Sequence, residues 1–459
     1  MLLELVRNTI RPGARTDNPE EIVRKACLCF QAERSKDLGG LIAEKLDSLR
    51  HYDVQGMDRV VAIVMWGRSG SILLASYFDG HEDVITLPES DGYLLQEFFE
   101  RYEPLPFRDK LLAYAVYEPS YTRFFAGDFA ISRTQYYAAV QAILEFSDGW
   151  PAEFLESRRA FFLFVHIAYQ LALGRRPGSS RPLIVYAQHF WDSTLARRLV
   201  EDFPEAKFIH TIRDPISACD SFFHNHVNAV ERFILLPFSA LNSLANKDQP
   251  QPGVEARTRT VRFEDLHSYT ADTMRGLADW LELDYQPSLL ESTFNGIPYV
   301  VKRDGSVWSG PRLEQLQRQS RHLSFKDRAL LFALFYENFR DWNYPCPKIF
   351  RHRTVRCVTF LSLFLLPTKM EITSSKVVFK RNIVPAVRQR KMGPIVASLV
   401  RIVWCRLQII RRLGLAFLRR CARRPLLLQT VRMTPQESGN SSATACNGKT
   451  VSREASASR

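Results

Sequence analysis

The sequence predicts an α/β protein in which a parallel β-sheet is flanked by helices and carries an α-helical insertion and a basic helical C-terminal extension. Short, uninterrupted runs of β-branched and other apolar residues recur along the chain, and long segments with helical spacing separate them. A glycine-containing turn follows the first run. With 459 residues, 46% of them hydrophobic, the chain can bury one large core or two ordinary ones. This combination is typical of a globular enzyme.

The predicted elements alternate along the chain. Residues 17–50 place apolar side chains at helical spacing and form a helical preface. Buried strands are predicted at 60–65, 84–87, 183–187, 207–212 and 257–262. Helices are predicted at 71–78, 92–117 and 152–173. Because the stretch 92–181 is too long for one crossover connection, it is expected to form a helical subdomain.

These elements divide the chain into four parts. Residues 1–57 form the helical preface, and 58–345 form the main α/β domain, with 92–181 as an insertion on its substrate side. Residues 346–434 form a basic segment, and the Ser-, Ala- and Thr-rich residues 435–459 are expected to be disordered.

The net charge of +13 is unevenly distributed. Residues 1–347 hold 39 Lys and Arg against 46 Asp and Glu, whereas residues 348–434 hold 20 basic residues against Glu371 alone. The main domain is therefore mildly acidic, and the basic character belongs to the C-terminal segment.

The eight cysteines form no C-x-x-C pair, and no His stands at zinc-ligand spacing from them, so no metal site is predicted. We expect reduced thiols that pack in the protein. The first 15 residues are charged throughout and contain no apolar run of signal-peptide length. These features favour a cytoplasmic protein.

The turn after the first strand is a candidate phosphate site. In the segment 66–74, WGRSGSILL, a strand passes through a glycine turn into a helix, so that main-chain N–H groups can approach a phosphate closely. Arg68 adds a permanent charge with forked donors, and Ser69 and Ser71 on either side of Gly70 add hydroxyl groups. The loop lacks the Lys of the G-x-x-x-x-G-K-[ST] pattern, which disfavours an ATP-dependent kinase. A turn of this kind also occurs in α/β proteins without a phosphate ligand.

A second charged turn ends the predicted strand 207–212. Arg213 stands at the strand's carboxyl edge, Asp214 can cap the next helix, and Pro215 can occupy its first turn. Ser221 follows two helical turns later, so that Arg213 and Ser221 could hold one anion beside the sheet. The alternative is a surface Arg–Asp pair with a buried helix serine.

Both segments resemble the P-loop sulfotransferase superfamily. Its donor loop typically reads R-S-G-[ST]-[ST] before an apolar helix, which residues 68–71 match in the first four positions, and its segment D-x-H-P-x-V is similar to 79–84. Residues 203–215, with a Ser eight positions after the Arg, resemble its 3′-phosphate segment, and 260–266 resemble its V-R-Y-E-D-L strand end. The resemblance covers about residues 58–345.

The resemblance implies a P-loop-like fold and the co-substrate 3′-phosphoadenosine 5′-phosphosulfate, abbreviated PAPS, without a metal ion. The donor's 5′-phosphosulfate end would lie on Arg68, Ser69, Gly70 and Ser71. Its 3′-phosphate would lie on Arg213 and Ser221, beneath a basic loop that contains Lys302 and Arg303. Two positions depart from the family pattern. Ile72 stands where a second hydroxyl residue is usual, and Gln188 stands where a family Lys would neutralise charge in the transition state.

Sulfuryl transfer also needs a base that accepts the proton of the acceptor. Glu89 follows the second predicted strand and stands 21 residues after Arg68, the interval at which the tyrosylprotein branch of the family has its catalytic Glu. His189, just beyond the strand 183–187, is the second candidate. A solvated loop carboxylate and a half-buried structural histidine are the alternatives, and His166 is interpreted as a packing residue.

The basic C-terminal segment predicts an amphipathic helix at 393–424. Its arginines lie mainly on one side of a helical wheel and its apolar residues on the other, with Ile402, Ile409 and Arg411 as exceptions. Such a helix suits the headgroup region of an anionic membrane, whereas the apolar run 358–366 is too short to span one. A helix packed on the domain and a nucleic-acid-binding tail are the alternatives, and the wide apolar face argues against nucleic acid.

The sequence therefore predicts a cytoplasmic sulfotransferase that moves a sulfuryl group from PAPS to a hydroxyl or amine, and that associates peripherally with a membrane. The acceptor is unknown; with the helix on a membrane, it could be a carbohydrate or a lipid-linked glycan. A nucleotide-binding pseudoenzyme, a small-molecule kinase that uses ATP, and a membrane scaffold are the competing hypotheses.

Overall fold

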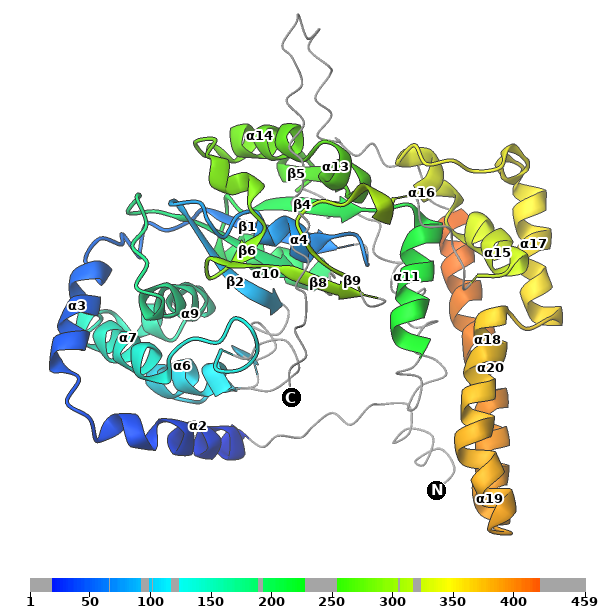
Figure 1. The fold of residues 1–459 in the computed structure, drawn as a ribbon, viewed down its shortest axis with the longest axis horizontal. Helices are drawn as coiled ribbons and strands as arrows, with labels where there is room; N and C mark the ends of the chain where they lie inside the picture. Colours follow the sequence, from blue (N-terminus) through cyan, green and yellow to red (C-terminus); the bar gives the residue numbers. More distant parts are fainter. Residues whose placement is uncertain are drawn as a thin grey trace, which may run out of the picture.

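A computed structural model describes residues 19–65, 67–91, 99–100, 102–116, 124–188, 193–227, 254–303, 306–316 and 323–421. At its centre lies a five-stranded sheet, all of whose neighbouring strands are parallel, in the order β2-β3-β1-β4-β5. The strands are β1 Val60–Met65, β2 Val84–Asp91, β3 Leu183–Gln188, β4 Lys207–Ile212 and β5 Thr258–Arg262. Helices flank this sheet (Figure 1), so the predicted fold class is confirmed.

The apolar runs form strands because both faces of the sheet are covered. Ala62 and Val64 of β1 lie in a hydrophobic core on one face, and Val61 and Ile63 lie in a second core on the other face. All four side chains are at most 6% exposed. A strand that is buried on both faces needs apolar residues at every position, which explains the uninterrupted run.

The first core lies beneath the helices that precede β1 and those that follow β2. These are α2 Pro19–Arg34, α3 Gly39–Leu49, α6 Phe107–Val116, α7 Arg133–Phe146, α8 Ala152–Leu155 and α9 Arg158–Ala172. Helix α3 packs on α7 and α2 packs on α6, so the preface shares its core with the insertion. The single helix predicted at 152–173 is wrong in one respect. It is interrupted at Ser157, whose side chain accepts a hydrogen bond from Ala160 N at 3.1 Å and caps α9.

The second core lies beneath α4 Ser71–Ser76, α13 Phe263–Ser268 and α14 Thr270–Leu281, of which α13 and α14 are drawn above the sheet in Figure 1. Two short antiparallel hairpins follow: β6 Thr293–Phe294 with β7 Ile297–Pro298, and β8 Val300–Arg303 with β9 Ser306–Ser309. Helix α10 Ser193–Asp202 connects β3 to β4, and α11 Pro215–Val227 follows β4. Short 3₁₀ turns occupy Glu255–Arg257, Pro287–Leu290, Leu313–Gln315 and Lys348–Arg351.

The C-terminal helices lie beside α11 (Figure 1). They are α15 Phe325–Leu334, α16 Tyr336–Asp341, α17 Arg353–Leu365, α18 Lys369–Val378, a π-helical segment Phe379–Ile383, α19 Val384–Arg388 and α20 Met392–Cys421. A third core joins α11 to α15, α17 and the second half of α20. The basic segment is thus packed partly on the main domain, and the division of the chain into four parts remains a prediction.

Candidate functional site

The candidate site lies where β1 and β4 end side by side. These two strands are neighbours in the sheet, but the chain leaves β1 toward β2 on one side and leaves β4 toward β5 on the other. Such a reversal opens a crevice outside the carboxyl ends of the two strands, and ligands of open α/β sheets bind there. The loop 67–70 and the turn at Arg213 follow these two strand ends.

The loop after β1 has an unusual backbone. Gly67, Arg68 and Gly70 have φ angles of 112°, 51° and 85°, in the left-handed region. At Gly70 a side chain would be excluded by its neighbours as well, because an added Cβ would lie 2.7 Å from Cδ2 of Phe263. Successive turns of this kind can direct main-chain N–H groups toward an anion. Ser71 then begins α4 and is 3% exposed.

Ser69 connects this loop to β4. Its hydroxyl is 1% exposed and lies 2.8 Å from the hydroxyl of Thr211, which in turn lies 3.4 Å from the carbonyl oxygen of Val64. The predicted ligand Ser69 therefore already has a buried protein partner, which holds the loop against the neighbouring strand. Thr211 was not predicted as a site residue. Its position as a polar residue near the end of an apolar strand could have indicated such a role.

Arg213 contacts the loop directly. Its Nη1 donates to the main-chain oxygen of Arg68 at 3.1 Å, and its guanidinium lies 4.0 Å from the centre of the Phe263 ring. Since Phe263 also contacts Gly70, one aromatic ring holds both candidate anion-binding segments together. The structure thus brings the Arg68 and Arg213 segments to one place.

The turn after Arg213 is fixed by α11 and α13. Asp214 caps α11 as predicted, since its Oδ1 accepts from Ser217 N at 2.7 Å, and its own N–H donates to Glu264 Oε1 at 3.3 Å. Glu264 also accepts from the hydroxyl of Tyr344 at 2.5 Å. Ser221 lies in α11 and is 4% exposed. A charged turn held by this many partners can keep a fixed geometry.

His267 is a neutral group beside Arg213. Burial, together with the nearby Arg213 charge, lowers the pKa of His267 to about 4. Its Nδ1 accepts from Arg312 N at 2.8 Å, which connects α13 to the chain that follows β9. Phe263, Glu264 and His267 lie in or next to the segment 260–266 that carries the family resemblance, but sequence reasoning gave them no role.

Glu89 and Gln188 lie at the same edge of the sheet. Gln188 is the last residue of β3 and pairs with Val64 of β1. Strand β2 continues past Leu87 to Asp91, and its register against β3 shifts between Thr86 and Asp91, so Glu89 lies in an irregular part of the strand. Irregularities such as β-bulges are frequent next to active sites because they redirect side chains. The side chains of Glu89 and Gln188, and all of His189, lie outside the described residues.

Two further predicted positions are located only in part. Lys302 and Arg303 belong to β8, opposite Val307 and Ser306 of β9, and their side chains lie outside the described residues. Ile72 is half-buried and packs against the core of α4 and α14.

Within the part of the chain that the structure describes, no group of three or more His, Cys, Asp or Glu side chains could hold a metal ion.

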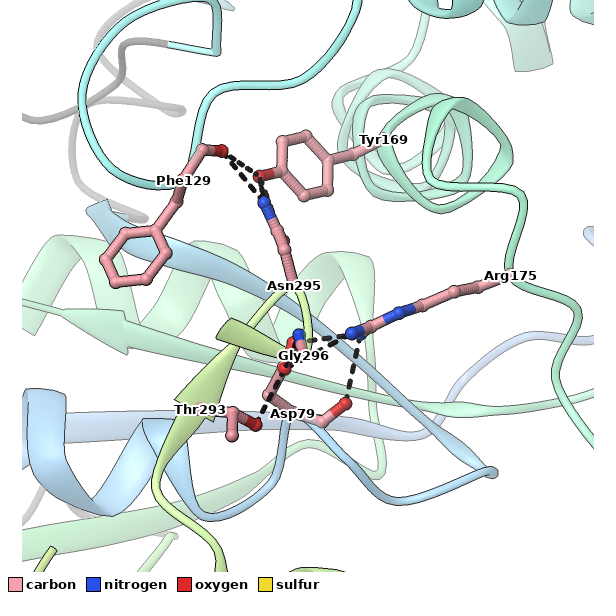
Figure 2. A network of polar contacts seen from close by, with 7 residues as sticks. All are labelled: Asp79, Phe129, Tyr169, Arg175, Thr293, Asn295 and Gly296. Atoms are coloured by element: carbon pink, nitrogen blue, oxygen red, sulfur yellow. Dashed lines mark hydrogen bonds and ion pairs between the residues drawn. The ribbon is translucent and has the colours of Figure 1, made fainter. Parts of the chain in front are cut away.

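A polar network lies beyond the far end of α4, the helix that follows the loop 67–70 (Figure 2). Asp79, just after α4, is 3% exposed and pairs with Arg175 at 2.9 Å. Its Oδ2 also accepts from the Thr293 hydroxyl at 3.0 Å and from Gly296 N at 2.9 Å. The adjacent Asn295 donates to the Phe129 carbonyl at 2.8 Å. The segment 78–84 therefore joins α4 to the insertion and to the β6–β7 hairpin.

Comparison with known proteins gives one family. Residues 61–287, which contain both loops, match the sulfotransferase family. No curated protein sequence matches significantly. Among solved structures, the chain is similar to the sulfotransferase domain of the Synechococcus PCC 7002 olefin synthase (16% identity, TM-score 0.37, 63% of this chain and 96% of that one).

Two other solved structures are similar. The sulfotransferase domain from the curacin biosynthetic pathway has 17% identity and a TM-score of 0.33, over 63% of this chain and 98% of that one. Sulfotransferase STF9 from Mycobacterium avium has 12% identity and a TM-score of 0.34, over 72% and 98%. From the match over residues 61–287, the chain belongs to the sulfotransferase family.

Proposed function

We propose that this transferase uses PAPS as its donor and moves the sulfuryl group to a hydroxyl or amine of its acceptor. The observation that carries the proposal is the hydrogen bond from Arg213 to the main chain of Arg68 at the switch point of the sheet. It brings two cationic segments together at one crevice, as a nucleotide with phosphates at both its 3′ and 5′ positions requires.

The two segments bind opposite ends of the donor. The main-chain N–H groups of the loop 67–71, with Arg68 and Ser71, bind the 5′-phosphosulfate end. Arg213 and Ser221 bind the 3′-phosphate, and Lys302 and Arg303 of β8 are its further proposed ligands. The backbone of Gly70 fits this role, because it leaves the loop without a side chain where Phe263 approaches.

The reaction is an in-line displacement at sulfur. The acceptor oxygen or nitrogen forms a bond to sulfur while the bond from sulfur to the phosphate oxygen breaks, and adenosine 3′,5′-bisphosphate leaves with the bonding electrons. The acceptor's proton passes to a base. Negative charge spreads over the sulfuryl oxygens and the leaving phosphate, so the cations of the loop stabilise the transition state more than the ground state.

Glu89 is the proposed base. Glu89 lies near the carboxyl end of β2, and only β3 separates β2 from β1, the strand that precedes the loop 67–70. The proposed base is therefore at the edge of the sheet where that loop also lies. His189, directly after β3, is the second candidate.

A nucleotide-binding pseudoenzyme is the second candidate function. Ile72 packs into the hydrophobic core and offers no hydroxyl group to the donor, and Gln188 carries no charge next to the end of β1. Both positions would reduce stabilisation of the transition state more than binding of the product nucleotide.

Release of labelled sulfate from radiolabelled PAPS tests the proposal without knowledge of the acceptor. Water can take the place of the acceptor in a slow side reaction that hydrolyses PAPS. We expect the chain to bind adenosine 3′,5′-bisphosphate, to release sulfate, and to transfer label to a hydroxyl-bearing acceptor from a glycan or glycolipid fraction. Binding without release or transfer would favour the pseudoenzyme. Tighter binding of ATP with magnesium than of the bisphosphate would favour a kinase.

The role of Glu89 is tested by Glu89→Gln. We expect sulfuryl transfer to fall by about 10²- to 10⁴-fold, because the amide cannot accept the proton, with little change in affinity for adenosine 3′,5′-bisphosphate. The control is Glu82→Gln, since Glu82 lies before β2, at the opposite end of that strand. Equal losses in both variants, or none in either, would remove Glu89 from the mechanism.

A further inference from the structure

The last helices form a hairpin that extends away from the sheet. Helices α18 and α19, with the π-helical segment between them, form one limb, and the first half of α20 forms the other; residues 369–404 are here called the C-terminal arm. Figure 1 shows α19 at its far end. Ile383, Ala386 and Ser398 are at most 6% exposed where the limbs pack together. The chain reverses at 389–391, where Lys391 N donates to the Ala386 oxygen at 2.9 Å.

The second half of α20 is packed on the main domain. Cys405, Ile409, Leu413, Ala416 and Phe417 are at most 5% exposed and belong to the core that contains α11 and α15. Arg406 pairs with Glu371 at 2.7 Å, and the nearly buried Arg420 donates to Asn338. Ile409, an exception on the predicted helical wheel, thus lies in the packed stripe. For this half of α20, the structure agrees with the alternative that the sequence left open, a helix packed on the domain.

A second apolar stripe runs along the outer face of α20. Met392, Val396, Leu399, Val403 and Leu407 are each at least half exposed. Their spacing of three or four residues places them on one face of the helix. On the other limb, Phe379 is 51% exposed and Val387 is 57% exposed. A continuous exposed stripe of this kind marks an interaction surface, whereas single exposed apolar residues do not.

Apart from Glu371, which pairs with Arg406, the charges of the arm all have one sign. Residues 372–404 contain seven Lys and Arg and no Asp or Glu. Arg388, Arg390 and Lys391 stand at the hairpin turn, and all three are exposed. Apolar side chains next to basic ones match the acyl boundary and the anionic headgroups of a lipid surface.

The arm is too short to span a bilayer. The helix Met392–Arg420 is long and apolar enough to span a membrane. Only 18% of its most apolar 18-residue stretch is buried inside the protein. Its packed half, however, cannot enter lipid without leaving the core. The part of α20 that is not packed on the main domain, residues 392–404, is about 20 Å long at 1.5 Å per residue. The hydrocarbon core of a bilayer is about 30 Å thick. The basic turn would also have to cross the apolar layer.

We propose that the C-terminal arm docks on the surface of an anionic lipid bilayer, with the stripe of Met392, Val396, Leu399 and Val403 in the acyl boundary and the basic turn among the headgroups. A second copy of the chain is a poorer occupant, because it would bring two basic arms together. Nucleic acid would leave the apolar stripe exposed.

The proposal has a consequence for the candidate site. Helix α18 packs on α11, which begins directly after Asp214, so the arm is connected to the site through two packed helices. A chain held by its arm therefore presents the carboxyl edge of the sheet in a fixed orientation to the membrane. The binding itself does not depend on sulfuryl transfer.

Vesicle flotation of the full chain tests the proposal. Vesicles of phosphatidylcholine are compared with vesicles in which about a third of the lipid is phosphatidylglycerol, at about 0.1 M and 1 M salt. We expect the chain to float with the anionic vesicles at low salt, and to bind neutral vesicles much more weakly. High salt should weaken binding to the anionic vesicles.

Two variants separate the contributions. Arg388→Gln/Arg390→Gln/Lys391→Gln should lower affinity for anionic vesicles by roughly a hundredfold, at about fivefold per charge. Val396→Glu/Val403→Glu should abolish flotation. The matched control is Leu28→Glu/Leu313→Glu, which adds the same charges at exposed apolar positions outside the arm, and it should float like the unmodified chain. Unchanged thermal midpoints show that the variants fold.

Three results would overturn the proposal. The first is a chain that stays in solution with anionic vesicles. The second is a dimer in light scattering that Val396→Glu/Val403→Glu converts to a monomer without any change in flotation. The third is binding to a DNA duplex that outcompetes the anionic vesicles.

Discussion

At the scale of single residues, Gly70 shows how closely the loop 67–70 fits its surroundings. Its φ of 85° disfavours any side chain, and the Phe263 ring occupies the space that a Cβ would need. The same ring lies over Arg213, so a displacement of Phe263 would move a proposed phosphate ligand as well.

Gly70→Ala should therefore lower the free energy of unfolding by about 2–4 kcal/mol, as backbone strain and a steric clash add together. It should also weaken binding of adenosine 3′,5′-bisphosphate. Gly127→Ala is the matched control, because Gly127 has nearly the same φ, 83°, but no atom within 4 Å of its added Cβ. It should cost only about 1–2 kcal/mol. Urea unfolding measures both, and equal costs would show that Phe263 does not restrict Gly70.

The sequence predicted that the Arg68 and Arg213 segments lie close together at the edge of the sheet, but not the groups that hold them there. Both arginines follow buried strands, and parallel strands bring such residues to one edge. Thr211 and Phe263 act through tertiary contacts with Ser69 and Gly70, from segments far away in the chain. A strand residue with a polar side chain can contact a loop, as Thr211 does, or it can contact solvent. The local sequence does not distinguish the two cases.

At the scale of secondary-structure elements, the apolar runs located all five strands of the parallel sheet, but not all their ends. Strand β2 extends to Asp91 through Pro88, Glu89 and Ser90, residue types that usually end a strand. Pairing with β3 resumes only at Asp91, after a shift in register that the local sequence does not encode. In α20 the helical wheel found one apolar side, whereas two stripes exist, because the neighbouring helices select which apolar residues are buried.

The Asp79 network tests how α4 is held. Asp79→Asn should lower the free energy of unfolding by about 2–4 kcal/mol, because Arg175 loses its charged partner and the buried site loses acceptors for Thr293 and Gly296. The adjacent Arg176 offers a control: it pairs with Asp47 at 3.9 Å, where both side chains are largely exposed. Asp47→Asn should change stability by less than about 0.5 kcal/mol. Similar effects of both substitutions in urea unfolding would contradict a structural role for this network.

At the scale of the whole molecule, two buried histidines make stability depend on pH. Burial lowers the pKa of His166 to about 4, and burial with Arg213 lowers that of His267 to about 4. Below a pH of about 6.5 the unfolded chain binds protons that the folded chain does not, so stability is present above that pH and decreases as the pH falls toward 4. Each histidine contributes a slope of up to about 1.4 kcal/mol per pH unit.

His166→Gln should make this decrease shallower between pH 6.5 and 4, because the buried histidine in α9 no longer takes up a proton on unfolding. Urea unfolding across this pH range measures the slope. His51→Gln, at an exposed position, is the control and should leave the slope as it is. An unchanged slope in His166→Gln would show that His166 does not contribute to the acid sensitivity.

The three scales meet in one claim, that the Arg68 loop and Arg213 bind opposite ends of a single nucleotide. Calorimetry compares adenosine 3′,5′-bisphosphate with adenosine 5′-phosphate, which lacks the 3′-phosphate, in the unmodified chain, in Arg213→Ala and in the control Arg275→Ala, whose side chain on α14 is 47% exposed. A charge-assisted phosphate contact makes the bisphosphate bind about 10- to 100-fold more tightly. Arg213→Ala should lose this preference, with a much smaller loss of affinity for the monophosphate than for the bisphosphate, and Arg275→Ala should keep it. A preference that survives in Arg213→Ala would contradict the account.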